Sequence, residues 1–327
     1  MIRSRQFLTL AVALAAISCW TSHPGRRPER TGFLRTAAPD DLQLAFTVIG
    51  DGPDTVVVLH GGPGLPSGAV RGALNGLADR WTFILYDQRG RGRSTLVPDS
   101  GELSAARDVD DLDQVRSYFH LQRMTLIAHH WGAVLAALYA KAHPDRVNRL
   151  ALLSPSFPQA SFLFWAATLP NDESATTRYL AALQAGEDTG SPLTFCRRYW
   201  GFAFAPIEVT DPSLVARLWK DMCDAPPAAL RDAPRVGRLV ASSLHGLDLR
   251  DTLAAIHVPA LILQGRGDTA SLAAGNAWTE WLPEGRRLVL SSPGLFPWLG
   301  EREPYVTALA RFLDGAWPAE AVRISTH

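Results

Sequence analysis

Short apolar runs alternate with amphipathic stretches along the first half of the chain. Runs typical of buried strands lie at residues 42–50, 55–60, 82–87, 124–129 and 149–154. Between them, residues 67–80, 104–120 and 131–144 have the periodicity of helices, and Pro144 ends the last of these. Short apolar strands separated by helices predict a parallel sheet that is buried on both faces.

The alternation stops at about residue 155 and resumes near residue 257. The intervening segment is rich in helix formers and aromatic residues and has no clear strand. Further strands are predicted at 260–268 and 286–292, followed by a helix at 305–317. We therefore predict a core made of residues 41–155 and 257–318, with a helical lid at 156–256 inserted late in the sheet.

The N-terminus has a different pattern. Residues 1–5 are basic and residues 7–20 are almost entirely apolar, which is too short to span a bilayer comfortably but suits an export signal over residues 1–19. Residues 16–19 also resemble a bacterial lipobox, in which Cys19 would carry the lipid. Ordinary signal cleavage nearby and an uncleaved anchor are the alternatives. Residues 20–40 are expected to form a linker, and the protein is expected to be periplasmic or membrane-anchored.

Composition narrows the range of partners. With a formal net charge of zero and 47% apolar residues, the chain should form a compact body without general attraction to nucleic acid. Cys196 and Cys223 could form a disulfide in an oxidising compartment, or they could be two small buried apolar side chains. No Cys/His cluster has the spacing of metal ligands, so no metal is expected.

Three motifs follow predicted strands in order. They are HGGPG at His60–Gly64, DQRGRGRS at Asp87–Ser94, and AHHWG at Ala128–Gly132, which joins a strand to a helix. Together they resemble the α/β-hydrolase fold, closest to its proline iminopeptidase branch, over about residues 41–315. The resemblance implies an α/β fold, with a mostly parallel sheet flanked by helices and a helical lid.

The resemblance also assigns roles within the first two motifs. The backbone N–H groups of Gly62 and Trp131 would form an oxyanion hole, aided by the dipole of the helix that Trp131 opens. His60 is expected to brace its loop at the edge of the substrate pocket. DQRGRGRS lacks the ending of a phosphate-binding loop, and Asp87 and Arg89 are interpreted as hydrogen-bonding braces.

The third motif departs from the family. His130 stands at the position of the nucleophilic serine, and Leu295 stands where the catalytic histidine is expected, whereas Asp268 retains the acid. Because leucine cannot accept a proton, an ordinary serine hydrolase is not expected. The longer imidazole could instead approach Asp268 and act as a general base.

A general base beside an oxyanion hole suits proton abstraction next to a carbonyl, and hence elimination, isomerisation, cyclisation or C–C cleavage. We expect a small or medium, largely apolar carbonyl substrate and neither a metal nor an organic cofactor. A catalytically silent ligand-binding protein is the main alternative, and a peptidase- or esterase-like hydrolase that uses His130 is a further one. The pocket would be lined by His60, Leu295, Phe296, Trp165 and Trp200, although such lid aromatics can equally pack lid helices together.

Overall fold

The computed structural model describes most of the chain beyond the N-terminal segment. The described residues are 29–37, 40–159, 190–203, 212–267, 269–292 and 294–324. The predicted export signal with Cys19, and the predicted site residues Trp165 and Asp268, lie outside the described residues, so these assignments stay predictions. Within the described ranges, no helix has both the length and the apolar character needed to cross a bilayer.

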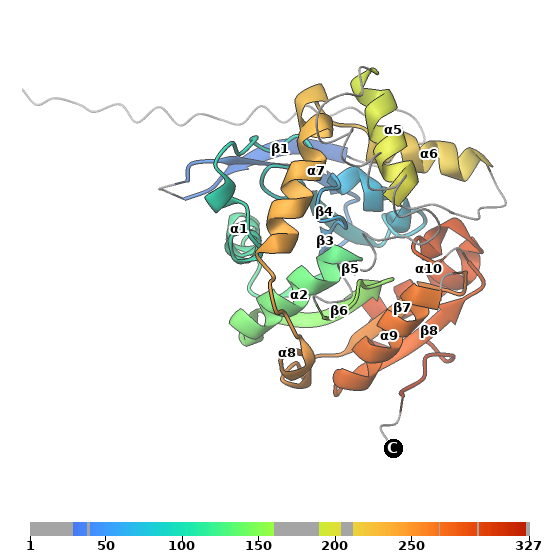
Figure 1. The fold of residues 1–327 in the computed structure, drawn as a ribbon. Coiled ribbons are helices and arrows are strands. Elements are labelled where there is room, and N and C mark those ends of the chain that lie inside the picture. Colours follow the sequence, from blue (N-terminus) through green and yellow to red (C-terminus); the bar gives the residue numbers. More distant parts are fainter. Residues whose placement is uncertain are drawn as a thin grey trace, which may run out of the picture.

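An eight-stranded sheet forms the centre of the molecule (Figure 1), with the order β1-β2-β4-β3-β5-β6-β7-β8. The strands are β1 Glu29–Arg35, β2 Gln43–Ile49, β3 Asp54–Leu59, β4 Trp81–Tyr86, β5 Met124–His129, β6 Val147–Leu153, β7 Ala260–Gly265 and β8 Gly285–Leu290. The β1–β2 and β2–β4 pairs are antiparallel and the other pairs are parallel. The α/β class predicted from the alternating pattern is confirmed.

Strand β1 differs from the sequence prediction, which placed residues 20–40 in a linker. Residues 29–35 pair along their whole length with β2 at the edge of the sheet. Leu34 is buried, whereas its neighbour Phe33 is exposed. An edge strand with one solvent-exposed face does not need a continuous apolar run. For this reason the sequence of β1 did not indicate a strand.

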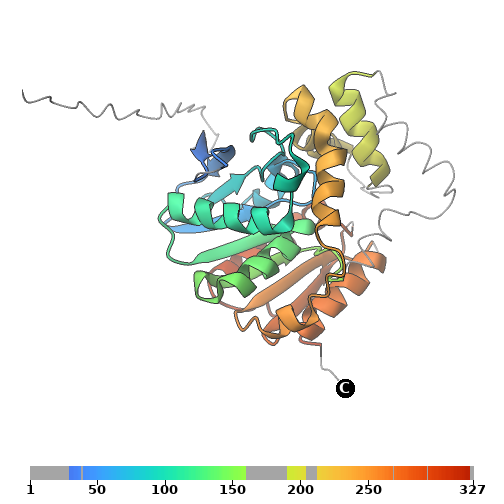
Figure 2. The same ribbon diagram turned by 60° about the vertical axis from the view of Figure 1, so that its left-hand side comes forward.

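Helices cover both faces of the sheet (Figure 2). Successive strand residues point to opposite faces of the sheet and belong to two hydrophobic clusters. Val57 lies in the cluster with α1 (Ala105–Tyr118) and α2 (Trp131–Ala142), and Val58 lies in the cluster with α10 (Arg302–Leu313). Helices α8 (Arg250–Ala254) and α9 (Thr269–Trp281) complete the first of these layers.

The segment predicted as a helix at 67–80 is shorter and tighter than expected. It forms a 3-10 helix, η1, over Ser67–Leu74, followed by turns. Gly76 has a φ of 91°, a backbone conformation that ends regular helix and that other residues rarely adopt.

Three lid helices gather at one end of the molecule (Figures 1 and 2): α5 Pro192–Ala203, α6 Pro212–Met222 and α7 Pro227–Ser242. A disulfide between Cys196 and Cys223 joins α5 to the end of α6, which resolves the alternative left open by the sequence. Val236 and Val240 on α7 are fully buried against the core, so this lid helix is anchored to the sheet layer beneath it.

Candidate active site

His130 occupies a sharp corner between β5 and α2. Its φ of 49° and ψ of −109° lie outside the regions that most residues adopt. Its N–H donates to Leu153 O at 3.1 Å, and its carbonyl accepts from the N–H groups of Ala133 (3.1 Å) and Ser156 (3.2 Å). These bonds hold the strained turn in place although the first glycine and the serine of the motif are absent.

The HGGPG loop packs directly against this corner. A Cβ added to Gly61 would stand 2.9 Å from His129 Nδ1 and 3.2 Å from His130 Cβ, so only a glycine fits without displacing these side chains. The next residue, Gly62, has a φ of 127°, which again favours glycine. The two motifs, which are about seventy positions apart in the sequence, therefore form one site.

Two backbone donors at this contact have no backbone acceptor. Neither the N–H of Gly62 nor that of Trp131 donates to a backbone carbonyl within the described part of the chain. Trp131 is the first residue of α2, where the N–H groups of a helix lack intrahelical partners and the dipole is positive. These are the properties that an oxyanion hole requires.

His60 is a brace rather than a pocket wall, because its side chain is fully buried. Its Nε2 accepts from the Gln88 N–H at 3.1 Å, so the proton lies on Nδ1, which donates to Gly61 O at 3.0 Å. Burial lowers the pKa of His60 to about 4, although the Asp87 charge opposes this shift. Gln88 also accepts from the Trp131 indole N–H at 3.2 Å, and sequence reasoning had not singled out this residue.

His129, the residue before His130, links the corner to the loop that carries Leu295. Its Nε2–H donates to Leu295 O at 2.9 Å, and its ring packs against Phe296 and Trp298 at centroid distances of 5.3 and 5.0 Å. Burial, followed by the proximity of His130, lowers the pKa of His129 to about 3. No local sequence signal could have indicated a bond that spans 166 positions.

The other predicted pocket residues are placed differently from one another. Leu295 is half-buried beside the corner, whereas Phe296 is fully buried behind it, against His129. Trp200 is 6% exposed and packs edge-on against Tyr199, 4.8 Å away, within the lid. Phe296 and Trp200 thus contribute mainly to packing, the alternative that the sequence had left open for lid aromatics. Trp165 and the acid Asp268 lie outside the described residues.

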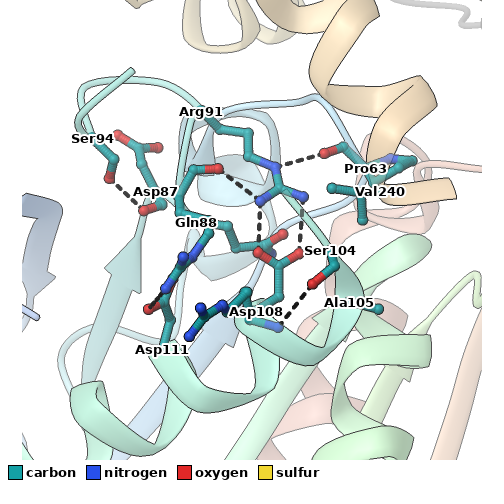
Figure 3. Close-up of polar contacts among 12 residues, drawn as sticks. Pro63, Asp87, Gln88, Arg91, Ser94, Ser104, Ala105, Asp108, Asp111 and Val240 are labelled. Atoms are coloured by element: carbon teal, nitrogen blue, oxygen red, sulfur yellow. Dashed lines mark hydrogen bonds and ion pairs between the residues drawn. The ribbon is translucent and has the colours of Figure 1, made fainter. Parts of the chain in front are cut away.

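The DQRGRGRS segment forms buried polar contacts with α1 and with the HGGPG loop (Figure 3). Arg91 forms a bidentate ion pair with Asp108. Its Nε–H also donates to Pro63 O at 2.8 Å, so that Arg91 is hydrogen-bonded to the HGGPG loop. Arg89 pairs in the same way with Asp111, and Asp87 accepts from the Ser67 N–H at 2.7 Å. The carboxylates and guanidinium groups of these contacts are buried, which agrees with the interpretation of Asp87 and Arg89 as hydrogen-bonding braces.

In the described part of the chain, no group of three or more His, Cys, Asp or Glu side chains is placed to hold a metal ion.

Comparison with known proteins agrees with this geometry. The alpha/beta hydrolase fold family matches residues 54–297, more than half of the chain. The chain therefore belongs to the α/β-hydrolase fold family, and its sequence relatives place it in the proline iminopeptidase-like branch.

Two relatives illustrate this branch. A proline iminopeptidase of Heyndrickxia coagulans is 28% identical over 277 residues, covering 80% of this chain and 91% of the relative. One from Lactobacillus delbrueckii subsp. bulgaricus is 27% identical over 286 residues, with 83% and 94% covered.

Solved structures share the fold. A proline iminopeptidase of Mycobacterium smegmatis superposes with a TM-score of 0.65 at 22% identity, covering 87% of this chain and 98% of the other. An esterase from Exiguobacterium antarcticum gives 0.64 at 22% identity, with 86% and 98% covered.

Proposed function

We propose that this protein hydrolyses an ester or amide of a small, largely apolar compound, with His130 as general base in place of a serine nucleophile. The observation that carries the proposal is the strained corner at His130, which is kept beside two backbone donors that have no backbone acceptor among the described residues. Backbone strain of this kind persists where the surroundings enforce it, commonly at active sites.

The proposed reaction needs no hydroxyl side chain. His130 takes a proton from a water molecule, whose oxygen attacks the substrate carbonyl carbon. The N–H groups of Gly62 and Trp131 stabilise the resulting oxyanion. Collapse of this intermediate breaks the bond to the alcohol or amine, and protonated His130 returns its proton to that leaving group. Asp268 is the proposed partner that orients the imidazole.

The neighbouring histidines support this assignment. His60 and His129 are neutral near pH 7, because burial holds their pKa values at about 4 and about 3. His60 also engages backbone partners through both ring nitrogens, and His129 does so through Nε2. His130 is half-buried whereas the other two are fully buried, and this difference favours His130 as the histidine that meets substrate.

The relatives favour hydrolysis over the elimination, isomerisation, cyclisation or C–C cleavage expected first from the sequence. Those named above are proline iminopeptidases and an esterase, which are hydrolytic enzymes. The substrates of those enzymes do not follow for this chain, because Leu295 and His130 replace the expected catalytic residues. We also infer that the protein is exported, a proposal that the Cys196–Cys223 disulfide supports because such bonds persist in oxidising compartments.

Turnover of p-nitrophenyl esters and aminoacyl p-nitroanilides by the wild type and by His130→Ala tests the proposed function. We expect the substitution to lower kcat/KM by about 10²–10⁴, the usual contribution of a general base. His257→Ala removes an exposed histidine before β7 and should leave the rate unchanged.

A fluorophosphonate probe separates the alternatives. Wild type should turn over substrate without labelling, because no serine acts as nucleophile. Labelling of the wild type would show an ordinary serine mechanism, and turnover that survives His130→Ala would remove His130 from the reaction. Absence of turnover on every substrate, with ligand binding retained in both proteins, would support the silent binding protein.

A further inference from the structure

A cavity lies away from His130, between lid helix α6 and the core. Its volume is about 100 Å³, and its walls come from α6, η1, α10 and the short helix η4 (Pro297–Leu299). Figure 1 shows α6 on the same side of the molecule as α10. Neither the corner at His130 nor the HGGPG loop contributes to its lining.

One wall presents a buried hydrogen-bond donor. Trp298 is 7% exposed, and its indole N–H has no acceptor among the described residues. The N–H edge faces Gly72, whose added Cβ would stand 3.0 Å from Nε1, and Gly72 lines the same cavity. Because a buried donor without an acceptor is unfavourable, an acceptor atom placed in this cavity would be bound favourably.

The charges around the cavity favour an anion. Arg217 on α6 and Arg302 on α10 both line it, and neither forms an ion pair or hydrogen bond with a described residue. Asp221 is the acidic side chain in the lining. Burial raises the pKa of Asp221, with the Arg71 charge opposing the shift. Two positive charges against one negative charge leave a net attraction for a negatively charged group.

Beside the polar Asn75, the lining includes the apolar side chains of Leu214, Leu218 and Val306. We propose that this cavity is an accessory binding site for a small organic carboxylate with an apolar body. The carboxylate accepts from the Trp298 indole N–H and from the two guanidinium groups, and the apolar body packs against the leucines and Val306. The proposal is independent of the reaction at His130.

The position of Trp298 connects this cavity to the site. Its ring lies edge-on to the His129 ring, with centroids 5.0 Å apart, and His129 holds the Leu295 loop through its hydrogen bond to Leu295 O. A bound carboxylate would therefore contact a side chain that packs directly against the residue preceding His130.

The test uses benzoate as the probe and the full chain labelled with ¹⁵N. Each tryptophan gives one indole N–H signal, and Trp298→Phe identifies that of Trp298 by its loss. Benzoate should move this signal in a saturable manner, and benzyl alcohol, which has a similar body but no charge, should not. Arg217→Gln and Arg302→Gln should each weaken binding about fivefold or more, as expected for loss of a charge-assisted hydrogen bond.

Matched variants test whether the cavity residues themselves bind the carboxylate. Arg311→Gln alters another arginine of α10 that does not line the cavity and should leave benzoate affinity unchanged. Gly72→Ala removes no charge but places a methyl group against the indole N–H, and it should abolish the shift while the thermal transition shows that the protein is folded. His130→Ala should bind benzoate as the wild type does, even if hydrolysis is lost.

Three results would overturn the proposal. The first is a Trp298 signal that stays in place at tens of millimolar benzoate. The second is an equal shift with benzyl alcohol, and the third is an equal loss of affinity in Arg311→Gln and Arg302→Gln. None of these results bears on hydrolysis at His130, so the two proposals can fail separately.

Discussion

The contact between the HGGPG loop and lid helix α7 makes a quantitative prediction for two glycines that face each other. A Cβ added to Gly64 would stand 2.5 Å from Ala233 O on α7, which is about 1 Å closer than carbon and oxygen normally approach. A Cβ added to Gly237, on α7 itself, would meet nothing closer than Gly64 N at 3.8 Å. The same substitution should therefore have opposite effects at the two positions.

The magnitudes follow from the type of atom in contact. Gly64→Ala forces two backbone segments apart, and overpacking of this kind costs about 1–3 kcal/mol. Alanine also restricts the unfolded chain more than glycine does, and this offsets roughly 0.4–1 kcal/mol of the destabilisation in Gly64→Ala. Gly237→Ala fits without displacement and should gain about 0.5–1 kcal/mol, because alanine is the better helix former. We expect the free energies of unfolding of the two variants to differ by about 2 kcal/mol.

Thermal unfolding followed by circular dichroism measures this difference. For a chain of this size, a shift of about 2 °C per kcal/mol separates the two Tm values by roughly 4 °C, with Gly237→Ala at or above the wild type. Displacement of the loop at Gly64 should also move the Gly62 N–H and lower the hydrolysis rate. Equal Tm values for the two variants, or a lower value for Gly237→Ala, would refute the inferred contact.

Two further predictions concern stability. Replacing Cys196 and Cys223 together by alanine should destabilise the protein by about 3–4 kcal/mol, because the disulfide closes a loop with a sequence separation of 27. Denaturant unfolding of the oxidised wild type, the reduced wild type and the double variant measures this loss of stability. Equal free energies of unfolding for all three would contradict the prediction. Stability should also fall as the pH drops from about 6.5 towards 4, because the unfolded chain protonates His60 and His129 whereas the folded chain, with their pKa values lowered to about 4 and about 3, does not. Urea unfolding between pH 7 and 4 should show a slope that His60→Gln reduces by one proton, and an unchanged slope would show that His60 is not held neutral.

Local pattern determined much of the scaffold. The apolar runs that became β3 to β7 are buried on both faces, so their hydrophobicity had to be continuous and was visible in the sequence. The order of the three motifs fixed the position of the corner at His130 for the same reason, since each motif follows one of these strands. Edge strand β1 was missed because its exposed face leaves no continuous apolar run. The helix predicted at 67–80 was too long, because periodicity does not reveal the positive φ of Gly76.

Contacts between distant segments were decided only by the tertiary structure. His129 meets the Leu295 loop, and Arg91 holds the HGGPG loop through Pro63 O, because parallel strands bring their carboxyl ends to one edge of the sheet. The pairing of Cys196 with Cys223 likewise depends on how α5 and α6 are placed. The sequence by itself determined which residue types stand at the corner between β5 and α2. The local sequence does not encode burial. Only the tertiary structure therefore distinguishes the half-buried His130 from the two buried braces, His60 and His129.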